Sequence, residues 1–209
     1  MSSVNVYLFD DYDALDENFI SNNIHLLPAS RAERCMRFRQ DIDKINCTIA
    51  YLMLKYGLEE NFGISSEIEF VYNEYKKPFL KEFPQIFFNF SHCKRGVVCA
   101  IADFEIGVDI QDFEPFNINV ARRVCSKNEL IELDKSDNPS RLFCRFWTQK
   151  ESYAKAMGVG IGSVLNQDLC LNNFWYYENE LYCLTVFCEN KNVKLIMNDV
   201  GMLIKRQFK

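Results

Sequence analysis

Apolar and polar positions along the first half of the chain follow patterns that predict both strands and helices. Residues 4–9 alternate in polarity and include two β-branched valines, which is typical of a strand. After Pro28, apolar residues recur at helical spacing and predict one long helix over residues 30–56 that ends at Gly57. Residues 68–72 and 86–90 are expected to be strands, and residues 97–102 and 106–111 are expected to pair as a hairpin.

The second half of the chain repeats this order loosely. Ser126 and Glu129 have the spacing of a capping box, which predicts a helix start. A longer helix is expected over residues 140–157 and should end at Gly158, and residues 175–177 and 181–188 predict another hairpin. Helices combined with antiparallel sheets in each half predict an α+β fold, with subdomains over residues 1–105 and 106–209.

Composition and charge exclude several classes of protein. The 209 residues suffice for one large or two small domains, and 48% of them are hydrophobic, with no apolar run near the roughly 18 residues of a membrane span. The first twenty residues are acidic where a secretory signal would be basic and then apolar, so we expect a cytoplasmic protein. A net charge of -5 argues against nucleic acid or an anionic membrane as partner, so a local basic cluster must hold any bound anion.

The nine cysteines do not form a recognisable framework. Their number is odd, no C-x-x-C occurs, and the chain has only two histidines. We therefore expect neither a zinc site nor disulfides, but small apolar side chains in a reducing compartment.

The sharpest local pattern is the segment from Gly107 to Gln111. On a strand, Val108 and Ile110 would face the core, while Asp109 and Gln111 would share an accessible face. A carboxylate and an amide oxygen side by side are ligands suited to magnesium. A strand edge with two solvated polar residues would show the same alternation.

The long helix of the second half carries a second pattern. Trp147, Glu151 and Lys155 lie four residues apart and share a helix face. Glu before Lys at this spacing is also an ordinary surface pair, worth about 0.2–0.5 kcal/mol. Trp147 on the same face favours a partly buried stripe, where such a pair would be poorly solvated.

Two further groups carry polar chemistry in the first half. The strand over residues 86–90 leads into Ser91 and His92, although a histidine at a strand end can be a simple turn residue. Arg31 and Arg34 lie three apart on a helix, so their two guanidinium groups could grip a phosphate. A solvated basic face would look the same.

In their order along the chain, these segments resemble the motifs of the Sfp-type 4'-phosphopantetheinyl transferase family. The matching segments are Asn89-Phe90-Ser91-His92, Gly107-Val108-Asp109-Ile110, Phe146-Trp147, Lys150-Glu151 and residues 155–160, with upstream support from Arg37-Phe38, Asp43 and residues 74–78. The resemblance covers residues 28–163 and is specific because three motifs occur in one order.

This resemblance implies a fold, a reaction and a set of partners. It implies an α/β sandwich of two pseudo-twofold-related subdomains, acting as a monomer, with coenzyme A in the cleft between them. The implied reaction is the magnesium-dependent transfer of 4'-phosphopantetheine from coenzyme A to a serine of an acyl or peptidyl carrier protein. A non-catalytic homologue that binds coenzyme A or the carrier is the alternative, although a mere binder would not need the Glu151–Lys155 pair. A P-loop phosphotransferase is disfavoured because no G-x-x-x-x-G-K-[ST] segment occurs.

The resemblance also implies roles for individual residues. Asp109 and Glu151 would be the magnesium ligands, with the Gln111 amide oxygen or a water completing the shell, and Glu151 would also be the general base, directly or through a metal-bound water. The remaining roles are pyrophosphate contacts for Lys155 and His92, a 3'-phosphate clamp for Arg31 and Arg34, and nucleotide contacts for Lys77 and Ser91. Gln111 stands where the bacterial family prototype has a second acid, and Asn46 stands where a basic residue is usual. Glu129 matches a family acid whose role is left open.

A carrier protein would need a docking surface on this acidic chain. The best candidate is the basic and apolar segment that follows Asp109, namely Phe113, Phe116, Val120, Arg122, Arg123 and Lys127. The alternative is that the phenylalanines belong to the core and the basic residues to a solvated face.

Overall fold

The computed structural model describes residues 4–189 and 192–205. The first half contains β1 (Val4–Phe9), α1 (Phe19–Asn23), α2 (Ala29–Met36), α3 (Asp41–Phe62), β2 (Phe70–Tyr72), β3 (Pro78–Leu80), β4 (Phe87–His92) and β5 (Val97–Ala102). The remainder contains β6 (Gly107–Asp112), α4 (Ile118–Val124), α5 (Lys127–Asp134), α6 (Pro139–Met157), β7 (Phe174–Glu178), β8 (Tyr182–Phe187), β9 (Val193–Met197) and α7 (Val200–Lys205).

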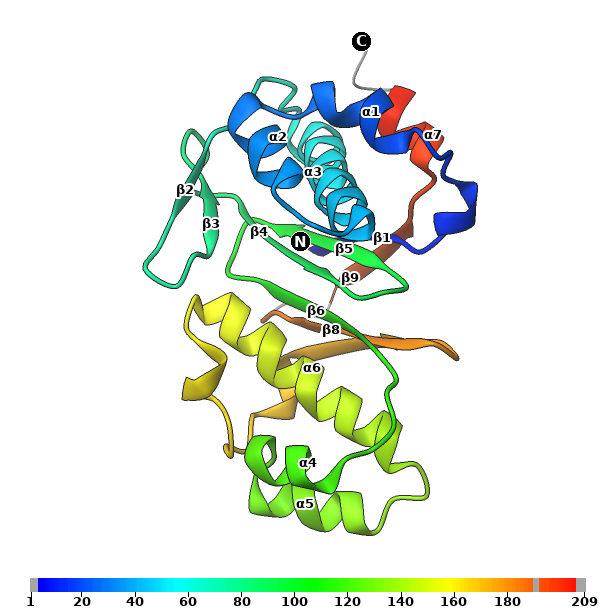
Figure 1. Ribbon diagram of the computed structural model, residues 1–209. Coiled ribbons are helices and arrows are strands. Elements are labelled where there is room, and N and C mark those ends of the chain that lie inside the picture. The colour runs from blue at the N-terminus through cyan, green and yellow to red at the C-terminus, as the bar shows by residue number, and fades with distance from the viewer. Residues whose placement is uncertain (1–3, 190–191, 206–209) are drawn as a thin grey trace.

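Two stacked β-sheets lie between two groups of helices (Figure 1). The first sheet has the order β4-β5-β1-β9, in which β1 is antiparallel to β5 and parallel to β9. The second sheet has the order β6-β8-β7 and is antiparallel throughout. Strands β2 and β3 form a separate two-stranded ribbon beside the stack. This mixture of helices and mainly antiparallel sheets confirms the predicted α+β class.

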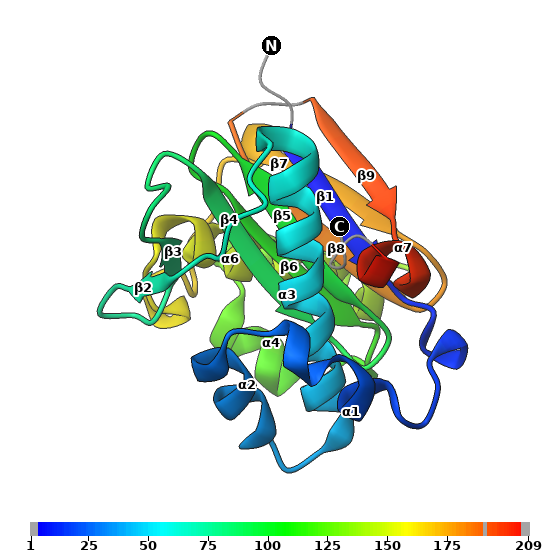
Figure 2. The same ribbon diagram turned by 90° about the horizontal axis from the view of Figure 1, so that it is seen from above.

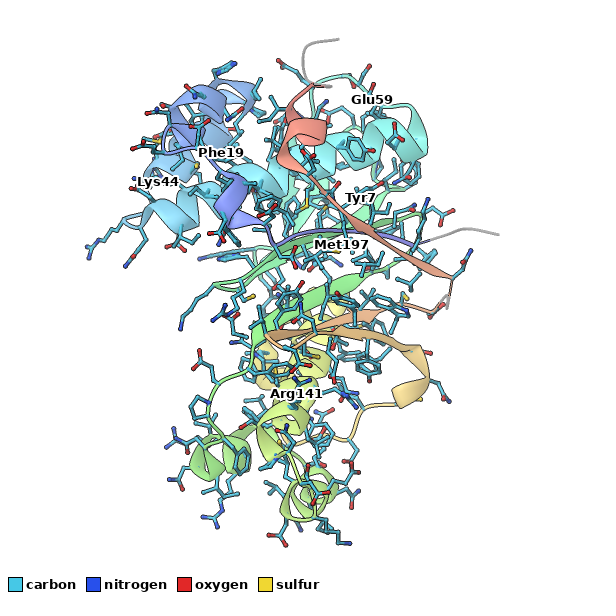
Figure 3. The ribbon with its side chains drawn as sticks, turned by 90° about the vertical axis from the view of Figure 1, so that its right-hand side faces the viewer. Tyr7, Phe19, Lys44, Glu59, Arg141 and Met197 are labelled. Atoms are coloured by element: carbon cyan, nitrogen blue, oxygen red, sulfur yellow. The ribbon has the colours of Figure 1, made fainter. Side chains whose placement is uncertain are left out.

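Alternating side chains of β1 and β5 supply two hydrophobic cores. Tyr7 and Ile101 face α3, which runs across the first sheet (Figure 2), whereas Val6 and Ala100 face the second sheet. The side chains of both sheets meet in that inter-sheet layer (Figure 3). Because both faces of the first sheet are covered, both strands are apolar at nearly every position.

The predicted helix over residues 30–56 is wrong as a single element. It divides into α2, which ends at Met36, and α3, which begins at Asp41 and continues to Phe62. Gly57 instead lies inside α3, where it permits close packing of the helix on the sheet. A β-carbon at this position would lie 2.4 Å from Ile101 Cδ1. The helix ends instead at Gly63, which has a φ of 67°.

The predicted pairing of residues 97–102 with residues 106–111 is also wrong. Both segments are strands, but β5 pairs with β1 and β4, while β6 pairs with β8 of the other sheet. Val108 and Ile110 of β6 pack into the inter-sheet core, so the connection between β5 and β6 carries the chain from one sheet to the next.

Other predicted elements of the second half are confirmed. Helix α6 is capped by the side chain of Asn138 and ends at Gly158, which has a φ of 64°. The Ser126–Glu129 capping box is complete at the start of α5, and β7 and β8 form the expected hairpin. All nine cysteines are free thiols. Within the described ranges, every helix is too short or too polar to cross a bilayer.

The end of the chain returns to the first half. Strand β9 lies beside β1, with Val193 opposite Val4, and the buried Leu203 of α7 belongs to the same hydrophobic core as α3. The division at residues 105 and 106 stays a prediction, and residues 193–205 pack with the elements of the first subdomain.

Candidate active site

Asp109 lies at the centre of a network that joins three elements. Its Oδ1 accepts hydrogen bonds from Ser91 Oγ of β4 at 2.7 Å and from Lys155 Nζ of α6 at 2.6 Å. The same ammonium also donates to Ser91 Oγ at 2.9 Å. Residues that are 64 positions apart in the chain thus share one carboxylate oxygen.

The alternation predicted for β6 is confirmed, but its polar face is covered. Val108 and Ile110 point into the inter-sheet core, and Asp109 faces α6, where it is only 5% exposed. Helix α6 can lie this close because Gly107 has no β-carbon. A β-carbon there would lie 1.9 Å from the Ser152 carbonyl oxygen. The glycine therefore places Lys155 on the carboxylate.

The second oxygen of Asp109 suits a cation. Asp109 Oδ2 is buried and has no hydrogen-bond partner among the described residues. Leaving such an oxygen unsatisfied costs about 1–3 kcal/mol, and more when it is charged. A hard divalent cation would satisfy it. Since residues 4–189 and 192–205 hold no cluster of three His, Cys, Asp or Glu side chains, such an ion would also need amide or ligand oxygens.

Glu151 lies half-buried on α6, one turn before Lys155. Burial raises the pKa of its carboxyl group above the ordinary value, Asp109 adds to this effect, and the Lys155 ammonium opposes it. A carboxylate made more basic in this way is suited to accept a proton.

Gln111 of β6 and Trp147 of α6 extend the site. Gln111 follows Asp109 by two positions on β6 and lines a cavity of about 310 Å³ with Trp147, Phe143 and Val120. The predicted face of Trp147, Glu151 and Lys155 is therefore turned toward β6, and its tryptophan is partly buried, as expected.

His92 ends β4 beside this network and remains exposed to solvent. Partial desolvation by the surrounding protein lowers the pKa of its imidazole, and the positive charge of Lys155 lowers it further. The negative charges of Asp43 and Asp109 oppose this shift. The imidazole is therefore mainly uncharged at neutral pH, where it can donate or accept a hydrogen bond.

Arg31 and Arg34 line a neighbouring cavity of about 670 Å³. The Arg31 guanidinium lies 5.2–5.8 Å from three aromatic ring centroids, and its buried Nε has no hydrogen-bond partner in the described chain. Arg34 contacts Tyr72, whose hydroxyl is 3.4 Å from its Nη1. The carboxylates of Glu67, Glu69 and Glu82 line the same cavity, so an anion would bind at its arginine side.

Lys77 is held by two contacts within the protein. Its ammonium, whose side chain is 6% exposed, donates to Glu105 at 2.8 Å and to the Ala156 carbonyl oxygen at 2.5 Å. The bond to Ala156 ties the first half of the chain to the end of α6, whereas the bond to Glu105 lies within the first half. A nucleotide contact for Lys77 stays a prediction, as does one for Ser91, which bonds to Asp109.

Glu129, whose role was left open, lies in a buried ion pair. Its carboxylate caps α5 and pairs at 3.0 Å with Lys150, which is fully buried. The Lys150 ammonium also donates to the Gln167 carbonyl oxygen at 2.5 Å. These contacts indicate a structural role for the Glu129–Lys150 pair.

The sequence patterns did not identify Asn73. Its Oδ1 accepts hydrogen bonds from the backbone amides of Tyr75 and Lys77, and its Nδ2 donates to the Gly158 carbonyl oxygen at 2.9 Å. The β2–β3 turn is thereby fixed to the end of the helix that carries Glu151 and Lys155. Asparagine is common in turns, which was the available signal.

Comparisons with known proteins identify the family of this chain. A family model described as the 4'-phosphopantetheinyl transferase superfamily matches residues 105–187, a range that includes Asp109, Glu151 and Lys155. The chain is 30% identical over 155 residues to 4'-phosphopantetheinyl transferase Sfp of Bacillus subtilis (strain 168), covering 72% of this chain and 67% of that protein. It is 32% identical over 177 residues to 4'-phosphopantetheinyl transferase gsp of Aneurinibacillus migulanus, covering 83% of this chain and 70% of that protein.

A further relative is covered less completely. The chain is 31% identical over 141 residues to a 4'-phosphopantetheinyl transferase of Bacillus subtilis, covering 66% of this chain and 63% of that protein. The chain thus spans about two thirds of the length of these relatives. The identity and extent of these matches establish the family. The chain belongs to the 4'-phosphopantetheinyl transferase superfamily, a family of enzymes that transfer phosphopantetheine from coenzyme A to carrier proteins.

Proposed function

We propose that this chain transfers the 4'-phosphopantetheine of coenzyme A to a serine of an apo acyl or peptidyl carrier protein and releases adenosine 3',5'-bisphosphate. The observation that carries the proposal is the buried Asp109 carboxylate, which uses one oxygen for Ser91 and Lys155 and leaves the other without a partner. Glu151 lies one turn from Lys155 and has a raised pKa.

Magnesium is part of this proposal. Asp109 would hold it through Oδ2, with Glu151 as a second ligand and the Gln111 amide oxygen or water completing the set. When bound, the ion would neutralise charge on the phosphate oxygens of coenzyme A.

Side chains of the protein would bind the substrate and transfer the proton. Lys155 and His92 would hold the pyrophosphate oxygens, and Arg31 with Arg34 would hold the 3'-phosphate. The serine oxygen would form a bond to the β-phosphorus while the bond from that phosphorus to the leaving bisphosphate breaks, and Glu151 would accept the serine proton. An acid–base group of this kind contributes about 10²–10⁴-fold to the rate.

We further propose that the protein acts as a cytoplasmic monomer without nucleic acid or membrane partners. The net charge of -5 supports the part of this proposal that concerns nucleic acid and anionic membranes. The carrier could belong to fatty-acid, polyketide or nonribosomal peptide synthesis, which share the serine acceptor.

The first prediction is the activity itself. Purified protein mixed with coenzyme A, magnesium and an apo-carrier should add one phosphopantetheine to the carrier, measured by intact-protein mass spectrometry. Glu151→Gln keeps the side-chain volume and should reduce the rate at least about 100-fold, because it removes the proton acceptor. Its melting temperature should equal that of the wild type.

Two results would contradict the proposal in different ways. If the folded wild type binds coenzyme A but modifies no carrier from any of the three pathways, the protein is the non-catalytic binder. Near-normal turnover by Glu151→Gln at saturating magnesium would exclude Glu151 as both ligand and base.

A further inference from the structure

Lys76 has a backbone conformation that is unfavourable for a lysine. Among the described non-glycine residues, only Lys76 and Asn166 have a positive φ, at 65° and 60°. Asparagine adopts this left-handed region comparatively readily, whereas a lysine β-carbon crowds the backbone there. Glycine would adopt it without strain.

The turn around Lys76 imposes this conformation. The Lys76 amide donates to the Asn73 carbonyl oxygen at 3.0 Å, and the Asn73 amide donates to the Lys77 carbonyl oxygen at 3.1 Å. The Asn73 side chain also binds the Lys77 amide and the Gly158 carbonyl oxygen. Since so many bonds determine the turn, the strain at Lys76 is retained.

The turn places Lys76 at a cavity that leads to the candidate active site. The cavity measures about 220 Å³ and is lined by Lys76, Lys77, Phe90 and Lys155 among others. Lys155 is the residue whose ammonium contacts Asp109. The cavity therefore opens beside the proposed pyrophosphate site.

The two adjacent lysines differ in what their ammonium groups contact. Lys77 is buried and bonded to Glu105 and to the Ala156 carbonyl oxygen. Lys76 is exposed, and its ammonium forms no hydrogen bond or ion pair with residues 4–189 or 192–205. Of this pair, Lys76 has the charge available for a ligand.

We propose that Lys76 binds a phosphate group of coenzyme A and that Lys77 instead holds the turn on α6. The inference rests on the proposed function, because it takes coenzyme A as the ligand. A chain of net charge -5 must gather local cations around such an anion. Lys76, at the cavity wall, is one of these cations. A glycine at this position would relieve the backbone strain but would provide no positive charge for the phosphate.

The test separates the charge of Lys76 from its backbone. Coenzyme A binding is measured by calorimetry without a carrier protein. Lys76→Gly should bind about tenfold more weakly, since a charge-assisted contact is lost, while its melting temperature should not fall because glycine accepts the positive φ. Lys76→Arg should retain wild-type affinity.

Two control variants isolate the contact. Asn166→Gly makes the same backbone change at the other positive-φ position, and Lys135→Gln makes the same change of net charge at the exposed C-terminal end of α5. Both should leave coenzyme A affinity unchanged. Lys77→Met should lower the melting temperature, because the ties to Glu105 and Ala156 are lost.

Dephospho-coenzyme A identifies the phosphate involved. A tenfold loss with both ligands places Lys76 at the pyrophosphate, whereas a loss with coenzyme A alone places it at the 3'-phosphate. Equal affinity of Lys76→Gly and wild type for coenzyme A would overturn the inference, as would a Lys77→Met variant of normal stability that alone loses affinity. A wild type that does not bind coenzyme A would refute the proposed function itself.

Discussion

One oxygen of the Asp109 carboxylate contacts groups from both halves of the molecule. Ser91 comes from the first sheet and Lys155 from the helix beneath the second, so this atom helps to set how the halves meet. In the absence of other cations, the Lys155 ammonium balances the charge of Asp109. A phosphate ligand would compete for that ammonium and leave Asp109 more dependent on a metal ion.

The arginine pair leads to the second prediction, which belongs to single side chains. Arg34→Ala should raise the Michaelis constant for coenzyme A about tenfold or more, because a charge-assisted contact contributes about 1.5–3 kcal/mol. The same variant should behave like the wild type with dephospho-coenzyme A. Steady-state kinetics with both substrates decide the matter, and an equal loss with both would place Arg34 elsewhere.

Several residues of the network were predictable from the sequence, but not all of their contacts were. Asp109, Ser91, Glu151 and Lys155 were singled out by type and spacing, and the fold brings them together. The hydrogen bond of Lys77 to the Ala156 carbonyl oxygen could not be predicted, because that acceptor lies 79 positions away and carries no side-chain signal. Burial of Asp109 was missed for a related reason, since the covering helix is distant in sequence.

At the scale of elements, the contact between β6 and α6 decides the geometry of the site. Gly107 lets the helix backbone approach, since its missing β-carbon would fall 1.9 Å from the Ser152 oxygen and 2.6 Å from the Ala156 nitrogen. Both atoms belong to the backbone and cannot move aside alone. The positions of Glu151 and Lys155 therefore depend on the absence of a side chain at Gly107 of β6.

The third prediction follows from this contact. Gly107→Ala should destabilise the fold by about 1–3 kcal/mol or more, because α6 must shift away from β6, and transfer activity should fall at temperatures where the protein remains folded. Urea denaturation and the mass-spectrometric transfer assay measure the two effects. Gly162→Ala is the matched control, since no atom lies within 4 Å of its added β-carbon. Equal stability and activity of the two variants would show that this approach does not position α6.

Elements with strong local end signals were predictable, and elements defined by distant partners were not. Helix α6 has a capping Asn138 and a terminal Gly158, and its predicted bounds hold closely. Gly57 gave the same signal inside α3, where it serves packing against Ile101. The β5–β6 hairpin failed because the true partner of β6 is β8, more than 70 residues along the chain.

For the whole molecule, carrier recognition depends on where exposed apolar and basic groups gather. Phe113 is covered by the Arg141 guanidinium, and Phe116 packs against Phe143, so these two phenylalanines contribute less to the surface than predicted. On α4, Val120 is 43% exposed and the arginines 122 and 123 are exposed. Val120 also lines the cavity that reaches Gln111, which keeps α4 adjacent to the site.

The fourth prediction tests this surface. Arg122→Glu combined with Arg123→Glu should raise the Michaelis constant for an acidic carrier about tenfold at low salt, because two attractive charges become repulsive. Coenzyme A affinity, measured by calorimetry, should stay at the wild-type value. Carrier kinetics identical to the wild type at low salt would place the docking surface elsewhere.

The pairing of β9 with β1 has a consequence for biosynthesis. Residues 4–9 are synthesised long before their parallel neighbour at residues 193–197. Until then the nascent chain carries an apolar strand with one open edge, which is a ready template for pairing with another chain. A ribosome that stalls between β8 and β9 would therefore hold a nascent chain whose first sheet lacks its last strand, and a chaperone that covers β1 would act in that interval.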